Sequence, residues 1–487
     1  MMLNTEKKNP NIVFILADDM GYGDLGCYNA KSQINTPNMD KLANLGVMFT
    51  DAHSSSAVCT PSRYSILTGR YCWKTPLKKF VFFNYEQPLI ESNRLTVASI
   101  LKNVGYNTAC IGKWHLGLGW KAKPGAEIDF NRSYPWDRGN PDEKIEDNID
   151  FTADITGGPN DLGFDYAFYT SGCSTDQPPY CFIENKQCLR MSKAKKAQPK
   201  GSTRTGMVAD GWDNEIVDVE FTKRAKEYLH SQKDNENSNP FFLYLSLSSP
   251  HSPHMPPPFI KGVSNAGPRG DLVSLVDWSV GEIMSTLDEL NLHEDTLFIV
   301  TSDNGPLVGS IVPPDAGEWN AEINNGHRSA GLFRGYKGEI YEGGHRVPFI
   351  ARWPEHIQPD ITSNTPICLT DLLATFAGIT GASFGVEDDI DSMSMLSAMT
   401  GNDDNSVVRD YIIHHSGNGV FSIRKGKWKM IFESKGNGWD EGPVEGTDGQ
   451  LFNMETDAFE TEDVWNERQR LTSELELLFK NTIEGYR

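Results

Sequence analysis

The chain has 487 residues, with 45 basic and 66 acidic side chains and a formal net charge of −21. This length is enough for one large domain and a smaller one. The acidic balance argues against a nucleic-acid-binding protein, which normally presents a basic surface, but it allows a local basic pocket for an anionic substrate. No apolar stretch approaches the length that crosses a membrane.

The N-terminal segment and the cysteines bear on the compartment. Met1–Pro10 is polar and lacks the apolar core of a signal peptide, so the protein is cytoplasmic unless a signal peptide was removed. The eight cysteines, at positions 27, 59, 72, 110, 173, 181, 188 and 368, are too sparse for a disulfide scaffold. Cys181 and Cys188 are close enough to bridge a short loop. No pair has CxxC spacing, which argues against a zinc site.

The first apolar stretch ends in two carboxylates. Asn11–Leu16 is typical of a strand buried on both faces of a parallel sheet, and Asp18 and Asp19 follow it. Ligands of open α/β sheets bind at the carboxyl ends of such strands. Adjacent carboxylates repel each other unless a cation joins them. A solvated turn is the alternative, but the position after a buried strand favours a site for a hard cation.

The stretch Cys59–Arg63, with the sequence CTPSR, predicts a loop that enters a short helix. Thr60 suits the N-cap and Pro61 the first helical position, and Gly69 suits the left-handed residue that ends the helix. Cys59 would then precede a helix N-terminus, where free N–H groups favour an anion and lower the pKa of a thiol. A buried structural cysteine is the alternative interpretation.

Three further apolar stretches, 106–111, 240–248 and 296–300, each predict a buried strand followed by polar residues. These residues are Lys113 and His115, then His251 and His254, then Asp303 and Asn304. Lys113 and His115 are two apart, so they face the same side of an extended segment. The oxygen-bearing side chains Asp18, Asp19, Asp303 and Asn304 together suit Ca²⁺ or Mg²⁺ rather than zinc.

The remaining pattern alternates helices and strands, which predicts an α/β protein. Helices are predicted at 37–45, 62–68, 97–104, 214–232, 271–290 and 370–378, and strands at 47–50 and 347–351. Residues 120–212 predict mostly long surface loops with one candidate strand at 162–169, and 380–408 predict irregular chain. Strands at 411–415, 420–424 and 428–432 and a helix at 455–486 then form a C-terminal subdomain, 408–487, beside a main domain, 10–400.

Six segments in chain order resemble the motifs of the type I sulfatases, formylglycine-dependent and arylsulfatase-like enzymes of the alkaline-phosphatase superfamily. They are Asp18-Asp19, Cys59–Arg70, Gly112–Gly117, the segment with His251, Asp303–Gly305 and Lys337–Pro348. The resemblance covers nearly the whole chain. It implies an alkaline-phosphatase-like fold, with a central mixed, largely parallel sheet flanked by helices, and a catalytic domain over 10–400.

The resemblance also implies the chemistry. In that family a maturation enzyme oxidises the signature cysteine, here Cys59, to formylglycine. One hydroxyl of the formylglycine hydrate attacks sulfur to give a covalent sulfate ester, and the other expels the sulfate. Family members with a signal peptide are periplasmic or secreted.

The residue roles are carried over in the same way. Asp18, Asp19, residue 59, Asp303 and Asn304 hold one divalent cation, Ca²⁺ with Mg²⁺ as the alternative. Arg63 and Lys113 steady the formylglycine, His115 is the base of the release step, and His251 with Lys337 protonates the leaving oxygen.

The expected substrate is a sulfated carbohydrate, and the expected process is the degradation of a sulfated polysaccharide or oligosaccharide. Aromatic and basic side chains of two loop regions suit sugar rings and acidic groups, although the tryptophans could instead pin the loops to the core. They are Trp120, Trp136, Arg138, Arg204, Trp212, Trp319, His327 and Arg328. The rival functions are a phosphatase or phosphodiesterase of the same superfamily and a catalytically silent protein that binds sulfated glycans.

Overall fold

The centre of the molecule is a ten-stranded sheet. The computed structural model describes residues 9–83, 85–128, 143–233, 239–307, 325–401, 409–432 and 448–484. The strand order is β13 (Ile361–Ser363), β2 (Val47–Phe49), β12 (Phe349–Arg352), β11 (Thr296–Ser302), β1 (Asn11–Ala17), β10 (Phe241–Ser246), β4 (Asn107–Lys113), β5 (Tyr166–Thr170), β6 (Ile183–Glu184) and β7 (Gln187–Cys188). The five strands from β11 to β5 are parallel, whereas β12, β2 and β6 are each antiparallel to a neighbour. The mixed, largely parallel sheet is therefore confirmed.

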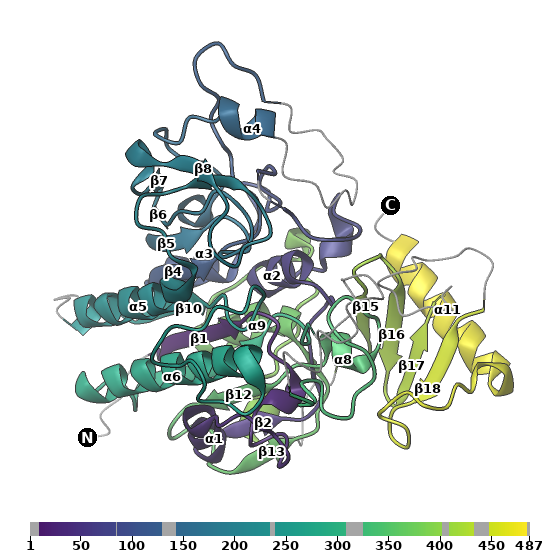
Figure 1. The fold of residues 1–487 in the computed structure, drawn as a ribbon. Helices are drawn as coiled ribbons and strands as arrows, with labels where there is room; N and C mark the ends of the chain where they lie inside the picture. The colour runs from purple at the N-terminus through teal and green to yellow at the C-terminus, as the bar shows by residue number, and fades with distance from the viewer. Residues whose placement is uncertain are drawn as a thin grey trace.

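Helices cover both faces of this sheet (Figure 1). One face packs against α2 (Cys59–Thr68), α3 (Val97–Asn103) and α9 (Leu372–Thr380), and the other against α1 (Pro37–Asn44), α5 (Val217–Lys233) and α6 (Gly267–Glu289). Successive residues of β1 alternate between the two faces, so Phe14 and Leu16 belong to the first core and Val13 and Ile15 to the second. This double burial explains why every residue of β1 after Asn11 is apolar.

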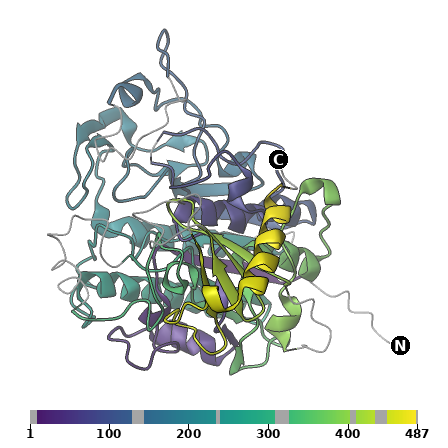
Figure 2. The same ribbon diagram turned by 90° about the vertical axis from the view of Figure 1, so that its right-hand side faces the viewer.

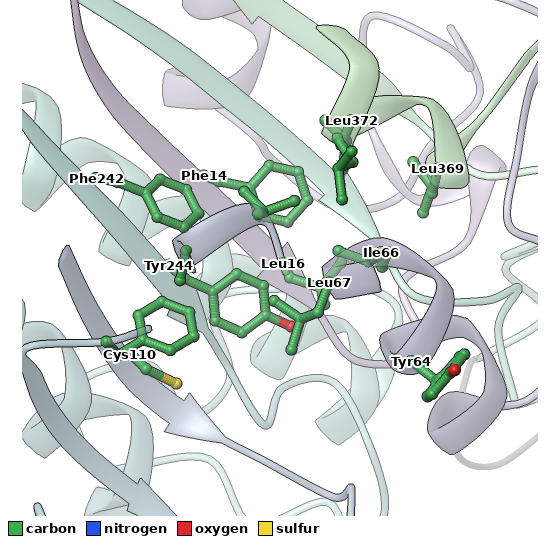
Figure 3. Close-up of a cluster of buried hydrophobic side chains, with 14 of the residues drawn as sticks. Phe14, Leu16, Tyr64, Ile66, Leu67, Cys110, Phe242, Tyr244, Leu369 and Leu372 are labelled. Carbon is green, nitrogen blue, oxygen red and sulfur yellow. The ribbon is translucent and has the colours of Figure 1, made fainter. Parts of the chain in front are cut away.

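The first of these cores surrounds α2, the helix that begins at Cys59 (Figure 3). Ile66 and Leu67 of α2 lie with Phe14 of β1, Tyr244 of β10 and Leu372 at the start of α9. Every residue of α2 is buried. The helix is thus held from all sides, and its N-terminus points from the core toward the edge where the strands end.

Regular structure is richer than predicted in two regions. Between residues 120 and 212, β5, β6 and β7 extend the main sheet, and α4 (Glu143–Asn148) and the hairpin of β8 (Lys195–Ala197) and β9 (Gly206–Val208) are added. Most of the described residues there lie outside helices and strands, as predicted, but the short strands β6–β9 were missed because strands of two or three residues leave no readable periodicity. Within 380–408, α10 (Leu396–Thr400) interrupts the predicted irregular chain. A further small sheet pairs β3 (Ala52–His53) with β14 (Ile367–Cys368).

A four-stranded antiparallel sheet forms the C-terminal part, as predicted. It consists of β15 (Ile412–His415), β16 (Phe421–Lys425), β17 (Trp428–Ile431) and β18 (Gln450–Asn453), and α11 (Gln469–Glu484) packs on it (Figure 2). The sequence missed β18, and the predicted helix begins fourteen residues too early, since 455–468 is turns and a short 3₁₀ helix, Trp465–Glu467. The division at residues 400 and 408 stays a prediction, since 402–408 lie outside the described residues.

A buried ion cluster joins this sheet to the main domain. The Nζ atom of Lys429 on β17 lies 3.0 Å from Glu342 Oε1, in the short helix α8 (Glu342–His345), and 2.7 Å from Glu460 Oε1. All three side chains are fully buried. The same Nζ donates to His345 Nε2 at 3.0 Å. Lys429 therefore compensates the charge of two carboxylates, and Arg346 Nη1, 3.0 Å from Glu342 Oε2, shares the compensation of Glu342.

Removing that lysine should destabilise the fold. Lys429→Ala removes the cation of Glu460 and one of the two cations that pair with Glu342, and we expect the free energy of unfolding to fall by about 3–5 kcal/mol. The control is Lys427→Ala, whose side chain is 49% exposed and pairs with Glu455 at 3.2 Å; a surface pair contributes at most about 1 kcal/mol. Urea denaturation measures both, and equal losses would contradict the assignment.

Candidate active site

The parallel strands bring the predicted polar residues to one edge of the sheet. Asp18 and Asp19 follow β1, Asp303 and Asn304 follow β11, His251 follows β10, and Lys113 ends β4 with His115 two residues on. Because parallel strands end together, residues up to 285 positions apart in the chain are in contact here.

Three carboxylates form the centre of this edge. The ligand oxygens of Asp18, Asp19 and Asp303 all lie within 4.8 Å of one another, and all three residues are buried. Asn304 Nδ2 donates to Asp19 Oδ1 at 2.7 Å, which leaves Asn304 Oδ1 without a partner, as Asp18 Oδ1 also is. Buried oxygens without donors, next to other carboxylates, fit a hard divalent cation such as Ca²⁺ or Mg²⁺.

Three buried cations surround the carboxylates. Arg63 Nη2 lies 2.8 Å from Asp303 Oδ2, Lys113 Nζ lies 2.5 Å from Asp18 Oδ2, and Lys337 Nζ lies 2.7 Å from Asp19 Oδ1. Burial alone would raise the pKa of Asp18, but these positive charges hold it well below its usual range. Burial and the neighbouring Asp18 raise the pKa of Asp303 to about 7. The carboxylates are thus not fully compensated by the side chains alone.

Cys59 lies at the N-terminus of α2, which begins two residues earlier than the sequence indicated. The N-cap is Val58, and Cys59 is the first helical residue. The predicted N-cap, Thr60, instead accepts a hydrogen bond at Oγ1 from the backbone N–H of Phe82 at 3.1 Å. The predicted lowering of the thiol pKa is also wrong: a hydrogen bond with Cys173 and burial raise the pKa of Cys59, and the nearby lysines do not compensate.

His115 is held as a neutral imidazole with a defined tautomer. Its Nε2 lies 2.7 Å from the carbonyl oxygen of Phe82, which only accepts, so Nε2 carries the proton and Nδ1 carries the free lone pair. Nδ1 faces the sulfur of Cys173 at 4.0 Å. Burial and the charge of Lys113 lower the pKa of His115 to about 4. This side chain is therefore ready to accept a proton.

His251 has the opposite character. Its Nδ1 donates to the carbonyl oxygen of Ser252 at 2.5 Å, so Nε2 points into the site, 3.8 Å from Asp19 Oδ2. Burial and the nearby Lys337 oppose protonation, yet the negative groups around the ring raise the pKa of His251 to about 10. His251 therefore carries its proton at neutral pH. His254 is half-buried, and desolvation and the charge of Arg269 lower its pKa to about 3, which fits a structural role.

Cys173 is a site residue that the sequence did not reveal. It follows β5, and its buried Sγ lies 3.2 Å from Lys113 Nζ and 3.6 Å from His251 Nε2. The available signal was its position after a strand that joins the sheet beside β4. The sequence predicted that strand only as a candidate at residues 162–169, so Cys173 could not be assigned to the edge of the sheet.

Two glycines let the segments approach closely. At Gly112, with φ of +119°, a Cβ would lie 1.8 Å from the carbonyl oxygen of Ser246 on the neighbouring strand. At Gly305 a Cβ would lie 1.9 Å from the carbonyl oxygen of Gly343. Only glycine fits at either place. The first contact places Lys113 beside β10, and the second places the segment that carries Lys337 against Asp303.

The residues predicted to contact the substrate have different surroundings in the structure. Trp120 packs on Tyr85 in the core, and Trp212 packs on Phe182, so both tryptophans pin their loops. His327 bonds to Asp24, Arg204 pairs with Asp176, and Arg328 is exposed. Trp136, Arg138 and Trp319 lie outside the described residues.

All eight cysteines lie in the described part of the chain, and each is a free thiol, so Cys181 and Cys188 do not form the bridge that their spacing allowed. Among the described residues, none of the helices is long and apolar enough to span a membrane.

Comparison with known proteins identifies the family. The family model described as Sulfatase matches residues 10–382. The chain belongs to the sulfatase family, and it is a sulfuric ester hydrolase with the alkaline-phosphatase-like fold of that superfamily. This membership counts against the phosphatase alternative, and it implies a divalent metal and formylglycine in general.

Similar sulfatases match nearly the whole chain. It is 33% identical to an N-acetylgalactosamine-6-O-sulfatase of Bacteroides thetaiotaomicron, over 98% of this chain and 93% of that protein. It is also 33% identical to human arylsulfatase A, over 88% of this chain and 76% of that protein. A solved structure from work on the metabolism of glycosaminoglycans by Bacteroides thetaiotaomicron superposes with a TM-score of 0.82, at 31% identity, over 98% of this chain and 99% of the other.

Proposed function

We propose that this sulfatase removes sulfate from a sulfated carbohydrate. The observation that carries the proposal is the full-length similarity to the N-acetylgalactosamine-6-O-sulfatase, which extends over 93% of that relative's length. Similarity to arylsulfatase A, at the same identity, extends over only 76% of that enzyme. The similarity also covers 98% of this chain.

The test is sulfate release from a panel of defined sulfated oligosaccharides beside a nitrophenyl sulfate. We expect a 6-O-sulfated galactosamine sugar to give the highest kcat/KM, and the rate to fall as salt rises, because the chain's net charge of −21 leaves only a local basic pocket to attract a polyanion. Faster turnover of the aryl ester than of every sugar would overturn the assignment. Binding of sulfated sugars without release would instead support the alternative of a silent glycan-binding protein.

For the cation, we propose that Asp18, Asp19, Asp303 and Asn304 hold one Ca²⁺ together with residue 59. Three carboxylates and an amide oxygen in a buried space favour Ca²⁺ over Mg²⁺, which usually retains several waters. When bound, the cation supplies positive charge to the sulfate ester and acidifies a hydroxyl of residue 59. The same positive potential comes from Lys113 and Lys337.

Removal of the cation should abolish activity. We expect exhaustive chelation to reduce the rate at least about 100-fold, and added Ca²⁺ to restore it more fully than added Mg²⁺. Asp303→Ala should give the same loss with a lower melting temperature. The matched control is Asp165→Ala, since Asp165 pairs with Lys102 at the surface and should leave the rate unchanged. Full activity after chelation would contradict the proposal.

For the nucleophile, we propose that Cys59 is converted to formylglycine by a maturation enzyme. The hydrate of that aldehyde supplies one hydroxyl that attacks sulfur and a second that later expels sulfate from the covalent ester. The position of Cys59, at a buried helix N-terminus next to Arg63, supports this assignment because the negative charge that develops there is close to N–H groups and a guanidinium. Arg63 and Lys113 steady the group.

The proton transfers follow from the two histidines. His251 Nε2 protonates the oxygen of the leaving alcohol, with Lys337 beside it, which fits its raised pKa. His115 Nδ1 accepts the proton of the second hydroxyl of residue 59, which fits its neutral state and fixed tautomer. One histidine thus gives a proton and the other takes one, because their surroundings shift their pKa values in opposite directions.

Conversion of residue 59 has a direct readout. Peptide mass spectrometry of the active enzyme should show the Cys59 thiol replaced by an aldehyde or its hydrate. Cys59→Ser should lose roughly 10⁴-fold or more in kcat and accumulate a sulfate ester on the serine, which has no second hydroxyl to expel it. Finding only the thiol in a fully active sample would exclude this nucleophile.

If a signal peptide has been removed, the enzyme acts in the periplasm or outside the cell.

A further inference from the structure

The unconverted site contains a second thiol whose surroundings differ from those of the calcium ligands. The sulfurs of Cys59 and Cys173 and a ring nitrogen of His115 all lie within 4.8 Å of one another, and all three residues are buried. The thiols share a hydrogen bond. Cys59 is therefore in contact with two sets of ligands: oxygens on one side, and sulfur and nitrogen on the other.

The two histidines are oriented as metal-ligating histidines usually are. A ligating imidazole typically donates its other N–H to a carbonyl or carboxylate. His115 does so through Nε2 to Phe82, and His251 through Nδ1 to Ser252. Their free nitrogens both face Cys173 Sγ, at 4.0 Å for His115 Nδ1 and 3.6 Å for His251 Nε2.

These separations are close to what a thiophilic cation needs. A tetrahedral Zn²⁺ with Zn–S of about 2.3 Å and Zn–N of about 2.0–2.1 Å sets sulfur and nitrogen ligands about 3.6 Å apart. The Cys173–His251 separation matches this, and the Cys173–His115 separation needs to close by a few tenths of an ångström.

Charge also favours such a cation over an additional hard one. Two thiolates neutralise the two charges of Zn²⁺, so the complex adds no net charge beside Arg63, Lys113 and Lys337. Lys113 Nζ, 3.2 Å from Cys173 Sγ, would donate a hydrogen bond to a ligating thiolate. Ca²⁺ and Mg²⁺ prefer oxygen and leave this sulfur-nitrogen set to soft metals.

We propose that the unconverted chain, with Cys59 as a thiol, binds a thiophilic divalent cation such as Zn²⁺ through Cys59, Cys173 and His115, with the fourth position facing His251. Binding releases the thiol protons and ties up the Cys59 sulfur. Conversion of Cys59 removes one thiolate and with it the site. The sequence could not indicate this site, since its ligands are 56 and 58 residues apart.

The test uses the full chain produced without a maturation enzyme, with the Cys59 thiol verified by peptide mass spectrometry. Co²⁺ is titrated in the presence of saturating Ca²⁺, which keeps the oxygen site filled, and Zn²⁺ is then added. We expect one equivalent of Co²⁺ with a thiolate-to-cobalt charge-transfer band that Zn²⁺ displaces, and a rise in melting temperature with Zn²⁺.

Substitutions assign the ligands. Mutation of a group that only hydrogen-bonds to a metal ligand weakens metal binding about 10–100-fold. Loss of a ligand itself should cost more, so Cys173→Ser and Cys59→Ser should each weaken Zn²⁺ binding at least about 100-fold and remove the charge-transfer band. Cys27→Ser, a half-buried thiol outside the site, is the matched control and should keep both. If Cys173→Ser does not fold, Cys173→Ala and Cys59→Ser decide.

An absent band in the unconverted chain, or a band that persists in the Cys173 or Cys59 variants, overturns the proposal. The metal site and the proposed formylglycine nucleophile can be contradicted independently of each other. A chain that binds Co²⁺ through both thiols but never acquires formylglycine would support the metal site and contradict the nucleophile. An active, converted enzyme whose precursor binds no Co²⁺ would do the reverse.

Discussion

The compensation of three buried carboxylates is the constraint on which the rest of the site depends. Asp18, Asp19 and Asp303 lie so close together that their repulsion in a buried place would be prohibitive without positive charge. The cations that offset it come from α2, from the end of β4 and from the segment after residue 335. Ion pairs therefore connect elements that the packing of the hydrophobic cores only places close to one another. A divalent cation on the remaining oxygens would leave the site positive, which is what a sulfate ester requires.

Much of this edge could be predicted from sequence, because the relevant strands are buried on both faces. Within Asn11–Leu16 and 296–300 every residue after the first is apolar, and polar residues follow at the carboxyl ends of these strands. The carboxylates and the basic residues could thus be assigned to one edge without knowing the strand order. The small sheet near the C-terminus was predictable for another reason: its first three strands contain β-branched or aromatic residues and are separated by glycine turns.

The failures have physical causes that act on particular residues. Cys173 follows β5, and the next strands of the sheet, β6 and then β7, are only two residues long, so no pattern marked it. β18 (Gln450–Asn453) is short, and its pairing with β17 is visible only in the folded sheet. The pKa of Cys59 was predicted in the wrong direction, because a helix N-terminus lowers a thiol pKa only where burial and a second thiol do not oppose it. Each error involves a tertiary contact.

The C-terminal sheet contributes to the site rather than lying beside it. The backbone N–H of Ala57, two residues before Cys59, donates to the carbonyl oxygen of His415 on β15. The turn after β15 also holds the neighbour of Lys337, since Gly417 N–H donates to the Gly338 carbonyl and Gly338 N–H donates to that of Ala57. One short chain of backbone hydrogen bonds thus joins the sheet to both sides of the site. The position of Lys337 relative to Cys59 is accordingly set by residues on both sides of the sequence division near residue 400.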